Sequence, residues 1–246
     1  MRIIISPAKK MNVDTGSFAC EALPQFLPKT EQLYERLRSM SYGELKALWK
    51  CNDQIAALNF ERLKTMDLRR GLTPAILAYE GIQYQYMSPG VFTYGELDYM
   101  REHLRILSGF YGILRPFDGV TPYRLEMQAK LRMGQAKDLY AFWGGSIAGS
   151  LFQETDCIIN LASAEYSRCV SAYLTDGVQF ITCIFGELSD GKVIQKGVHV
   201  KMARGEMVRF MAEKNITEPE ELQSFCALGY CFDGKLSTDT TYVFLK

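Results

Sequence analysis

The amino-acid sequence predicts a single α/β domain over residues 1–246, with a mixed β-sheet flanked by helices. Short apolar runs typical of buried strands alternate along the chain with helical periodicities. The strands are spaced too unevenly for a regular doubly wound sheet, and no repeat, low-complexity tract or clear linker divides the chain. A length of 246 residues with 48% hydrophobic residues is enough to bury one sizeable core.

The first third of the chain is predicted to be one strand followed by helices. Residues 1–5 form an apolar run that ends at Ser6-Pro7, as expected of a buried strand entering a turn. Ser41 and Glu44 have the spacing of a capping box, which predicts the start of a helix. Helices are expected over residues 29–40, 41–49 and 52–67, and the short apolar run 75–79 is expected to be a strand.

The rest of the chain alternates between helices and strands. A helix over residues 94–104 should lead into a strand at 105–107. Glycines and prolines then predict loop and tight turns over residues 108–123, and irregular backbone of this kind often builds sites. Beyond it we expect helices over 137–152, 162–170, 198–214 and 217–226, strands over 157–161 and 241–245, and a hairpin of strands 178–185 and 193–195 joined across Asp190-Gly191.

Cysteine and histidine content bounds the compartment and the metal chemistry. Seven scattered cysteines predict free thiols in a reducing compartment, and a redox sensor at Cys226 and Cys231 is a less favoured alternative. With two histidines and no clustered carboxylates, we expect no metal and no other cofactor. No apolar run approaches the roughly 18 to 20 residues of a membrane span, and no signal peptide is visible, so a cytoplasmic protein without a membrane partner is expected.

The distribution of charge is more informative than its sum. The formal net charge is zero, which by itself gives no support for a nucleic-acid partner. Lysine and arginine are in excess, however, over residues 101–137 and again over residues 196–214. If these two segments converge, they form a face that attracts anions. The alternative is that the charges only solvate the surface.

Three polar groupings lie where an anion could be bound. They are Ser6, Lys9 and Lys10 after the first strand, Asn160 and Ser163 after strand 157–161, and Lys201 with Arg204 one turn apart on a helix. A turn just past a strand end presents such groups together, and this edge of an α/β sheet often binds ligands. The alternatives are solvated lysines, a solvated helix face, and a helix N-cap at Ser163, which we favour for that residue.

Residues 104–127 are the most informative segment. Their glycines allow backbone N–H groups to approach a phosphate, their arginines offer bidentate donors, and their tyrosines offer flat stacking surfaces. The candidate residues are Ser108, Gly109, Tyr111, Gly112, Arg115, Tyr123, Arg124 and Glu126, and Asp118 and Glu126 are placed to orient the arginines. The segment resembles a helix-hairpin-helix DNA-binding element, although two residues, instead of the usual one, separate Gly109 from Gly112.

Sequence blocks spread over nearly the whole chain match a known family in order and spacing. The blocks are residues 6–9, 104–127, 137–144, 160–166, 203–205 and 229–232. In these blocks the chain resembles the YaaA peroxide-stress proteins of bacteria. The resemblance implies a cytosolic protein that limits oxidative damage under hydrogen peroxide and is associated with lower free intracellular iron. It also implies a single-domain α/β fold with a positively charged cleft that binds DNA.

The chain departs from the family pattern at positions that bear on the cleft. Gly81-Ile82-Gln83-Tyr84 stands where the family usually has Gly-Asp-Val-Tyr, so the chain lacks that carboxylate and whatever catalytic or metal-binding role it has. Gln128 stands where a glycine is common, and Met202 replaces a frequent lysine. The cleft is therefore expected to be less basic than in its relatives.

Two hypotheses of different classes follow. In the first, the protein binds duplex DNA without sequence preference, with phosphates contacted by Lys9, Lys10, Arg115, Arg124, Lys201 and Arg204 and by the amides of residues 108–112. In the alternative, it is an enzyme that acts on a nucleotide or nucleobase in a polar pocket, although no catalytic motif is recognisable. A deep, closed pocket favours the enzyme and its small nucleotide-like ligand, whereas an open groove as wide as a duplex favours DNA.

Overall fold

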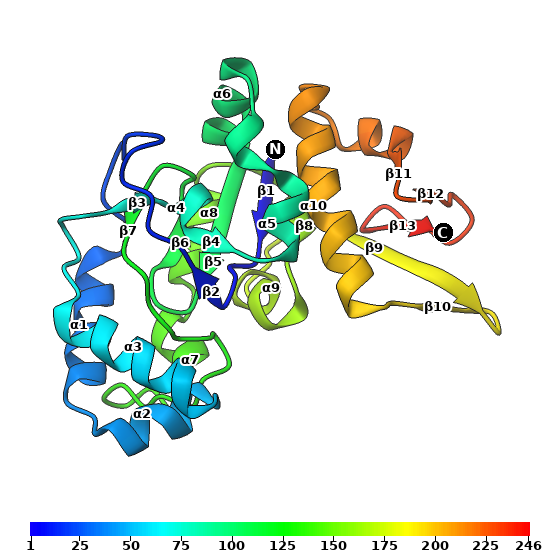
Figure 1. The fold of residues 1–246 in the computed structure, drawn as a ribbon. Coiled ribbons are helices and arrows are strands. Elements are labelled where there is room, and N and C mark those ends of the chain that lie inside the picture. Colours follow the sequence, from blue (N-terminus) through cyan, green and yellow to red (C-terminus); the bar gives the residue numbers. More distant parts are fainter.

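A mixed nine-stranded sheet is the centre of the computed structural model, which describes residues 1–246 (Figure 1). Its strands are β1 (Arg2–Ile5), β5 (Leu104–Ser108), β6 (Gly112–Leu114), β8 (Cys157–Leu161), β9 (Gln179–Ser189), β10 (Lys192–Ile194), β11 (Cys226–Ala227), β12 (Tyr230–Phe232) and β13 (Thr241–Leu245). They are ordered β11-β12-β13-β9-β8-β1-β5-β6, and β10 pairs with the far end of β9. The predicted mixed α/β sheet is confirmed.

Strand β1 lies in the middle of this sheet, parallel to β5 on one side and to β8 on the other. Ile3, Ile4 and Ile5 have no exposed surface, because helices cover both faces of the sheet. An uninterrupted apolar run is the expected sequence for a strand buried on both faces. The polar residues that follow β1 at Ser6 are therefore fixed at the carboxyl edge of the sheet.

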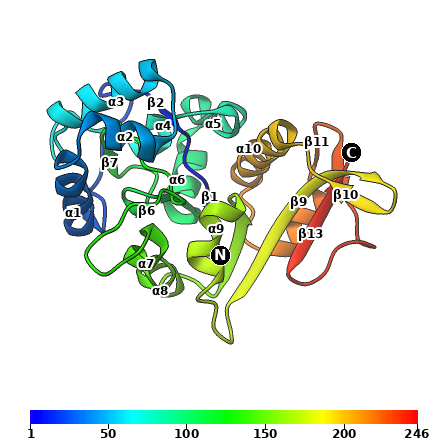
Figure 2. The same ribbon diagram turned by 90° about the horizontal axis from the view of Figure 1, so that it is seen from below.

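Helices cover the sheet from two sides, as Figure 2 shows for α5 and α10 on one side and α7, α8 and α9 on the other. The helices are α1 (Leu27–Arg38), α2 (Tyr42–Trp49), α3 (Asp53–Thr65), α4 (Ala75–Ala78), α5 (Ile82–Met87), α6 (Tyr94–His103), α7 (Leu139–Trp143), α8 (Ser146–Phe152), α9 (Ala164–Ser171) and α10 (Gly197–Glu213), with short 3₁₀ turns at Pro89–Val91 and Pro219–Ser224. Helices α1 to α3 form a separate group at one end of the molecule (Figure 1). None of the helices is long and apolar enough to cross a membrane.

Two predictions of local structure are confirmed in detail. Helix α2 begins at Ser41 with a capping box, in which Glu44 accepts from the Ser41 backbone N–H. Strands β9 and β10 are joined through Asp190 and Gly191, both with positive φ, as the Asp-Gly signal for a hairpin requires.

Several predicted elements are wrong. Residues 75–79, predicted as a strand, form helix α4 followed by the short strand β4 (Tyr79–Glu80), since the amides of Ala75 and Ile76 donate to carbonyls of the 116–118 turn. The predicted helix 137–152 is broken into α7 and α8, because Gly144 has φ +51° and ends the first. The 108–123 loop contains β6 and a short strand, β7 (Gly119–Val120), which pairs with β3 (Thr73–Pro74).

The prediction that all cysteines are free thiols is also wrong. Cys226 and Cys231 form a disulfide across the β11–β12 hairpin, because the strand register places the two residues opposite each other. The other five cysteines are free. This pairing favours the alternative hypothesis, a redox sensor at Cys226 and Cys231.

A close approach between α10 and α5 brings the C-terminal part of the chain to the carboxyl edge of β1. Gly205 of α10 packs so tightly on α5 that a Cβ at this position would lie 2.1 Å from the carbonyl oxygen of Gln83 and 2.9 Å from Tyr86 Cβ. Only glycine permits this contact, since real atoms do not approach so closely. Lys201 and Arg204, on the same helix, are positioned by it.

We expect Gly205→Ala to lower the free energy of unfolding by about 1–3 kcal/mol, because the added methyl group must push α10 away from the α5 backbone. Gly149→Ala is the matched control, since Gly149 lies within α8 with open space around it, and alanine there should add about 0.5–1 kcal/mol. Urea unfolding measures both changes. A Gly205→Ala protein as stable as the unaltered chain would show that the close approach is not a constraint.

Candidate functional site

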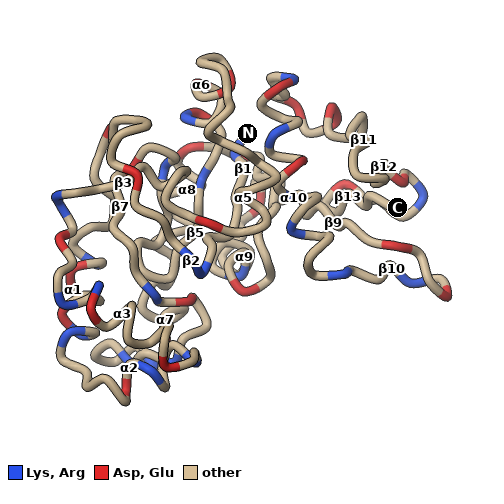
Figure 3. The backbone as a smooth tube through the Cα atoms, viewed as in Figure 1, with Lys and Arg blue, Asp and Glu red and all other residues tan.

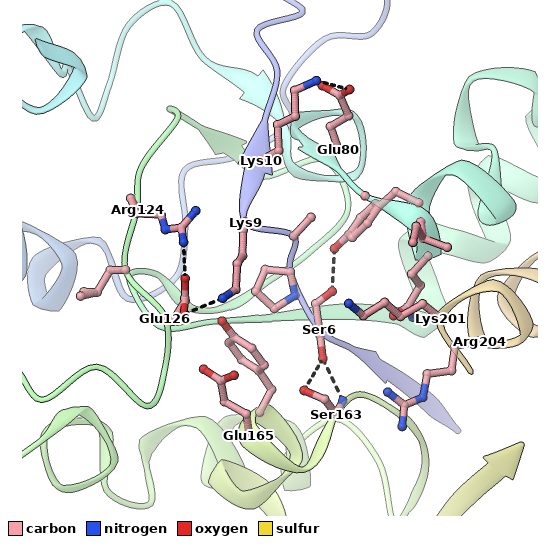
Figure 4. Close-up of a pocket in the computed structure, with 18 of the residues that line it drawn as sticks. Ser6, Lys9, Lys10, Glu80, Arg124, Glu126, Ser163, Glu165, Lys201 and Arg204 are labelled. Carbon is pink, nitrogen blue, oxygen red and sulfur yellow. Dashed lines mark hydrogen bonds and ion pairs between the residues drawn. The ribbon is translucent and has the colours of Figure 1, made fainter. Parts of the chain in front are cut away.

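A cavity of about 400 Å³ opens at the carboxyl ends of β1 and β8 (Figure 4). This is the sheet edge at which α/β proteins commonly bind ligands, and the volume lies within the usual range of small-molecule sites. Its lining includes nine of the residues predicted from sequence, namely Ser6, Lys9, Lys10, Tyr123, Arg124, Glu126, Ser163, Lys201 and Arg204. The fold therefore brings together most of the predicted polar groupings in one place.

Ser6 joins three chain segments at the floor of this pocket. Its hydroxyl oxygen accepts a hydrogen bond from the backbone N–H of Ser163 at 2.8 Å and lies 3.2 Å from the Ser163 hydroxyl oxygen. Its carbonyl oxygen accepts from the Tyr84 hydroxyl at 3.0 Å. Ser163 occupies the N-cap position of α9, as predicted, but its side chain faces Ser6 and does not cap the helix.

One wall of the pocket is an ion-pair cluster around Glu126. Lys9 Nζ lies 3.1 Å from one carboxylate oxygen, and Arg124 lies 2.8 Å from the other. The Arg124 contact lacks hydrogen-bond geometry, since the Glu126 Oε1 atom and the Arg124 Nε atom are both buried without a hydrogen-bond partner. At the rim, Lys10 pairs with Glu80 at 2.6 Å. These cations are largely neutralised by the protein's own carboxylates, and Glu126 retains unused hydrogen-bonding capacity.

Glu165, in the first turn of α9, adds a second carboxyl group to this wall. It accepts a hydrogen bond from the Gln128 N–H at 3.1 Å. Burial raises the pKa of the Glu165 carboxyl above its ordinary value, and the nearby Glu126 charge raises it further. A carboxyl group of this kind holds a proton more readily than an exposed one and is suited to proton transfer or to donating a hydrogen bond.

The opposite wall carries two cations that no carboxylate neutralises. Arg204 is half-buried, its Nε atom is buried without a hydrogen-bond partner, and burial lowers the pKa of its guanidinium group. Its guanidinium group extends toward Ser163 in Figure 4. Lys201 lies one turn earlier on α10 and is exposed. A buried N–H donor without a partner is costly, and a guanidinium group binds anions through paired N–H donors, so this wall of the pocket is suited to an anion.

A second cavity, of about 580 Å³, adjoins the first behind Arg204 and Ser163, which line both. Asn160 lines this second cavity and not the first. Its side chain is occupied in holding the end of β8, accepting from the Ala162 N–H at 3.0 Å and donating to Thr182 at 3.2 Å. Asn160 was predicted as a site residue, but it lies behind the main pocket, where its side chain holds the end of β8.

The predicted helix-hairpin-helix element is not confirmed, because residues 108–112 form a buried turn between the antiparallel strands β5 and β6. The Ser108 hydroxyl accepts from the amides of Phe110 and Tyr111 and bonds to the Tyr123 hydroxyl at 2.6 Å. Gly109 packs against the backbone of residues 125–127, and Gly112 against Trp143. These amides and the ring of Tyr111 are thus part of the core and face no ligand.

The basic excess of residues 101–137 is divided between two ends of the sheet. Arg124 reaches the pocket, but Arg105 and Arg115 gather with Arg2 around Glu154 near the amino end of β1. Arg101 pairs there with Glu21 and Asp98. Figure 3 shows basic and acidic residues interspersed along the whole backbone. The two basic segments therefore share a site only through Arg124, Lys201 and Arg204.

Sequence reasoning missed the contribution of α5 and the strand before it. Glu80, Gln83 and Tyr84 line the pocket, and the only signal for them is the Gly81–Tyr84 block, in which the chain departs from the family pattern. No group of three or more histidine, cysteine, aspartate or glutamate side chains is arranged to hold a metal ion.

Comparison with known proteins gives matches over the full length. A family model described as peroxide stress protein YaaA matches residues 1–236. A UPF0246 protein of Desulfitobacterium hafniense is 56% identical over 246 residues, which is 100% of this chain and 98% of the relative. UPF0246 proteins of Lachnoclostridium phytofermentans and Pediococcus pentosaceus are 54% and 50% identical, again over 100% of this chain and over 96% and 98% of their own lengths.

Asp118, beside the arginine cluster, provides a test of the electrostatics in solution. It is buried, its carboxylate accepts from the Arg115 N–H at 2.9 Å, and burial raises its pKa to about 6. Because this pKa lies above the unfolded value, the carboxyl group stabilises the fold at low pH, and that stabilisation is lost as the pH rises from about 4 through about 6.

Asp118→Asn keeps an oxygen acceptor but cannot ionise. We therefore expect the unfolding free energy of the variant to increase relative to the unaltered chain between pH 4 and pH 7, by up to about 3 kcal/mol. Urea unfolding at several pH values measures this difference. Asp176→Asn, at an exposed position, is the control. A difference that does not change with pH would contradict the burial of a charged carboxylate here.

Proposed function

Because the chain belongs to the peroxide stress protein YaaA family, we propose that it acts in the response to hydrogen peroxide by binding a nucleotide-like anion in the pocket between β1, α9 and α10. The observation that carries this proposal is the buried Nε–H of Arg204, which has no partner in the protein. Its natural place of action is the cytoplasm, where the five free cysteines would remain reduced.

The two walls of the pocket suit the two ends of such a ligand. Arg204 and Lys201 favour a phosphate group, since a guanidinium group binds phosphate through paired N–H donors. Glu126 and Glu165, on the opposite wall, accept N–H donors of the kind that nucleobases carry on their edges. A phosphate at one end and a hydrogen-bond donor at the other describe a nucleotide better than a simple inorganic anion.

Enclosure supports a small ligand over a duplex. The cavity volume of about 400 Å³ is within the range of about 300–1,000 Å³ that small-molecule sites occupy. Glu165, with its raised pKa, is the group best suited to act as a general acid or base if the bound nucleotide reacts. This pocket favours the alternative of an enzyme acting on a nucleotide or nucleobase, with Glu165 as the residue of interest.

Duplex DNA is the second candidate, and the exposed lysines at the mouth of the pocket favour it. The side chains of Lys9 and Lys10 are 64% and 73% exposed, and Lys201 is exposed as well. Phosphates of a bound strand could be neutralised there without entering the cavity. In this proposal neither Arg115 nor the amides of residues 108–112 contact DNA. Arg115 lies away from the pocket, beside Glu154, and residues 108–112 are buried.

We expect Arg204→Gln to weaken binding of nucleoside monophosphates about 10- to 100-fold, because a hydrogen bond to a charged group contributes about 1.5–3 kcal/mol. Isothermal titration calorimetry with the four common monophosphates measures the affinity. Arg209→Gln is the matched control, since Arg209 is on the same helix but pairs with Glu213 at 2.7 Å. Equal affinity of the two variants, or no binding by the unaltered protein, would contradict the proposal.

The DNA proposal has its own test. We expect Lys201→Ala to weaken binding of a fluorescent duplex at low salt and to reduce the slope of log K against log [salt] by about 1, as for the loss of one phosphate contact. Arg115→Ala should leave both unchanged, because its side chain lies in the Glu154 cluster. Fluorescence anisotropy titrations measure the affinity and its salt dependence. If the unaltered protein has no affinity for the duplex at low salt, the DNA proposal is wrong.

A further inference from the structure

The β11–β12 hairpin at the edge of the sheet carries the only disulfide of the chain. Cys226 and Cys231 are directly opposite in the antiparallel register, and their Cα atoms are 4.5 Å apart. Leu228 and Gly229, both with positive φ, form the turn between the two strands. The backbone thus places the two sulfur atoms within bonding distance through strand pairing over a very short loop.

Exposure distinguishes this pair from the other cysteines. Cys226 and Cys231 are both exposed, whereas Cys169 and Cys183 are buried, and burial raises the pKa of each of those thiols to about 12. Cys20 is exposed, but it has no cysteine partner. Exposed disulfides are the ones that exchange readily with reductants, and buried thiols are largely inert.

The hairpin does not depend on the disulfide for its position. Strand β12 pairs with β13 through Cys231 and Phe232, and β13 pairs with β9 along its whole length. Tyr230 packs its ring edge-on against Phe185 at 5.7 Å, and Phe232 packs against Phe244 at 5.7 Å. On the other strand, Phe225, next to Cys226, packs against Phe244 at 5.6 Å. We therefore expect the two thiols to stay opposite each other when the disulfide is reduced, so that oxidation needs no rearrangement of the fold.

A lysine that follows β13 lies beside this hairpin. The Lys246 side chain packs beside Gly229 at the turn, and its ammonium group lies 5.8 Å from the centre of the Tyr230 ring. The hairpin therefore combines exposure with a partner thiol, and a lysine side chain lies beside its turn.

We propose that Cys226 and Cys231 are a reversible dithiol–disulfide site that is oxidised by hydrogen peroxide. The thiolate of one cysteine attacks an oxygen of the peroxide, the O–O bond breaks, hydroxide leaves, and a sulfenic acid forms. The second thiol then attacks the sulfenic sulfur, which forms the disulfide and releases water. In sum, two thiols and one hydrogen peroxide give one disulfide and two water molecules. This site is independent of the nucleotide pocket.

Thiol trapping on the full chain tests the proposal. The protein is reduced with dithiothreitol under native conditions, freed of reductant, exposed to an equimolar amount of hydrogen peroxide, alkylated after denaturation, and digested with trypsin. Both cysteines lie in the peptide of residues 215–235, so a single mass reports their state. We expect two alkyl groups on this peptide before peroxide and none after it, while Cys169 and Cys183 are alkylated in both samples.

Variants separate a two-thiol site from general oxidation. In Cys231→Ser, Cys226 has no partner, so peroxide should give a sulfenic or more oxidised product and no internal disulfide. Cys51→Ser removes a free cysteine elsewhere and should oxidise like the unaltered chain. The proposal is overturned if dithiothreitol does not open the disulfide in the folded protein, which would make it structural, or if the reduced pair stays as thiols in peroxide.

Discussion

The parallel pairing of β1 with β5 and β8 is the constraint on which the rest of the structure depends. Ile3, Ile4 and Ile5 are buried on both faces, so no polar side chain can stand between the two ends of this strand. Polar residues are consequently sorted to its two ends. Arg2 joins the Glu154 cluster before the strand, and Ser6 begins the pocket after it. The buried strand thus separates two charged regions that the sequence places close together.

Charge pairing distinguishes the cations of this neutral chain from one another. Several arginines and lysines near the sheet have a carboxylate partner, as Arg105 has in Glu154 and Lys9 has in Glu126. Arg204 does not, and the burial of its Nε atom makes the missing partner costly. Local pairing, and not the net charge, therefore supports the proposed anion site. Arg115, a candidate because of its basic segment, lies outside the pocket and contacts Glu154.

The strands that end at the pocket could be predicted from the sequence, but the segments that surround them could not. Apolar runs predicted β1 and β8 correctly, and the residues that follow them, Ser6 and Ser163, are in the site. Within residues 104–127, Tyr123, Arg124 and Glu126 are in the pocket as predicted, but the interpretation of the glycines is wrong because they serve close packing: Gly109 leaves room for the 125–127 backbone. Glycine is used both where a loop backbone approaches a ligand and where two backbones pack closely, and only the tertiary structure distinguishes these two uses. The position of α5 in the pocket wall depends on its contact with α10. A contact between residues so far apart in the chain produces no recognisable pattern in the local sequence.

The β11–β12 hairpin is connected through β13 to the second cavity, which adjoins the pocket. Strand β12 pairs with β13, and Thr241 of β13 lines the second cavity together with Arg204 and with Thr182 of β9. A change of the disulfide that shifts β13 would therefore move the wall of a cavity that adjoins the unpaired guanidinium group. Because the core is close-packed, such a shift cannot be absorbed locally between β12 and β9. The aromatic contacts of Tyr230 and Phe232 with this layer oppose the shift, so the proposed oxidation of the cysteine pair is expected to leave the pocket unchanged.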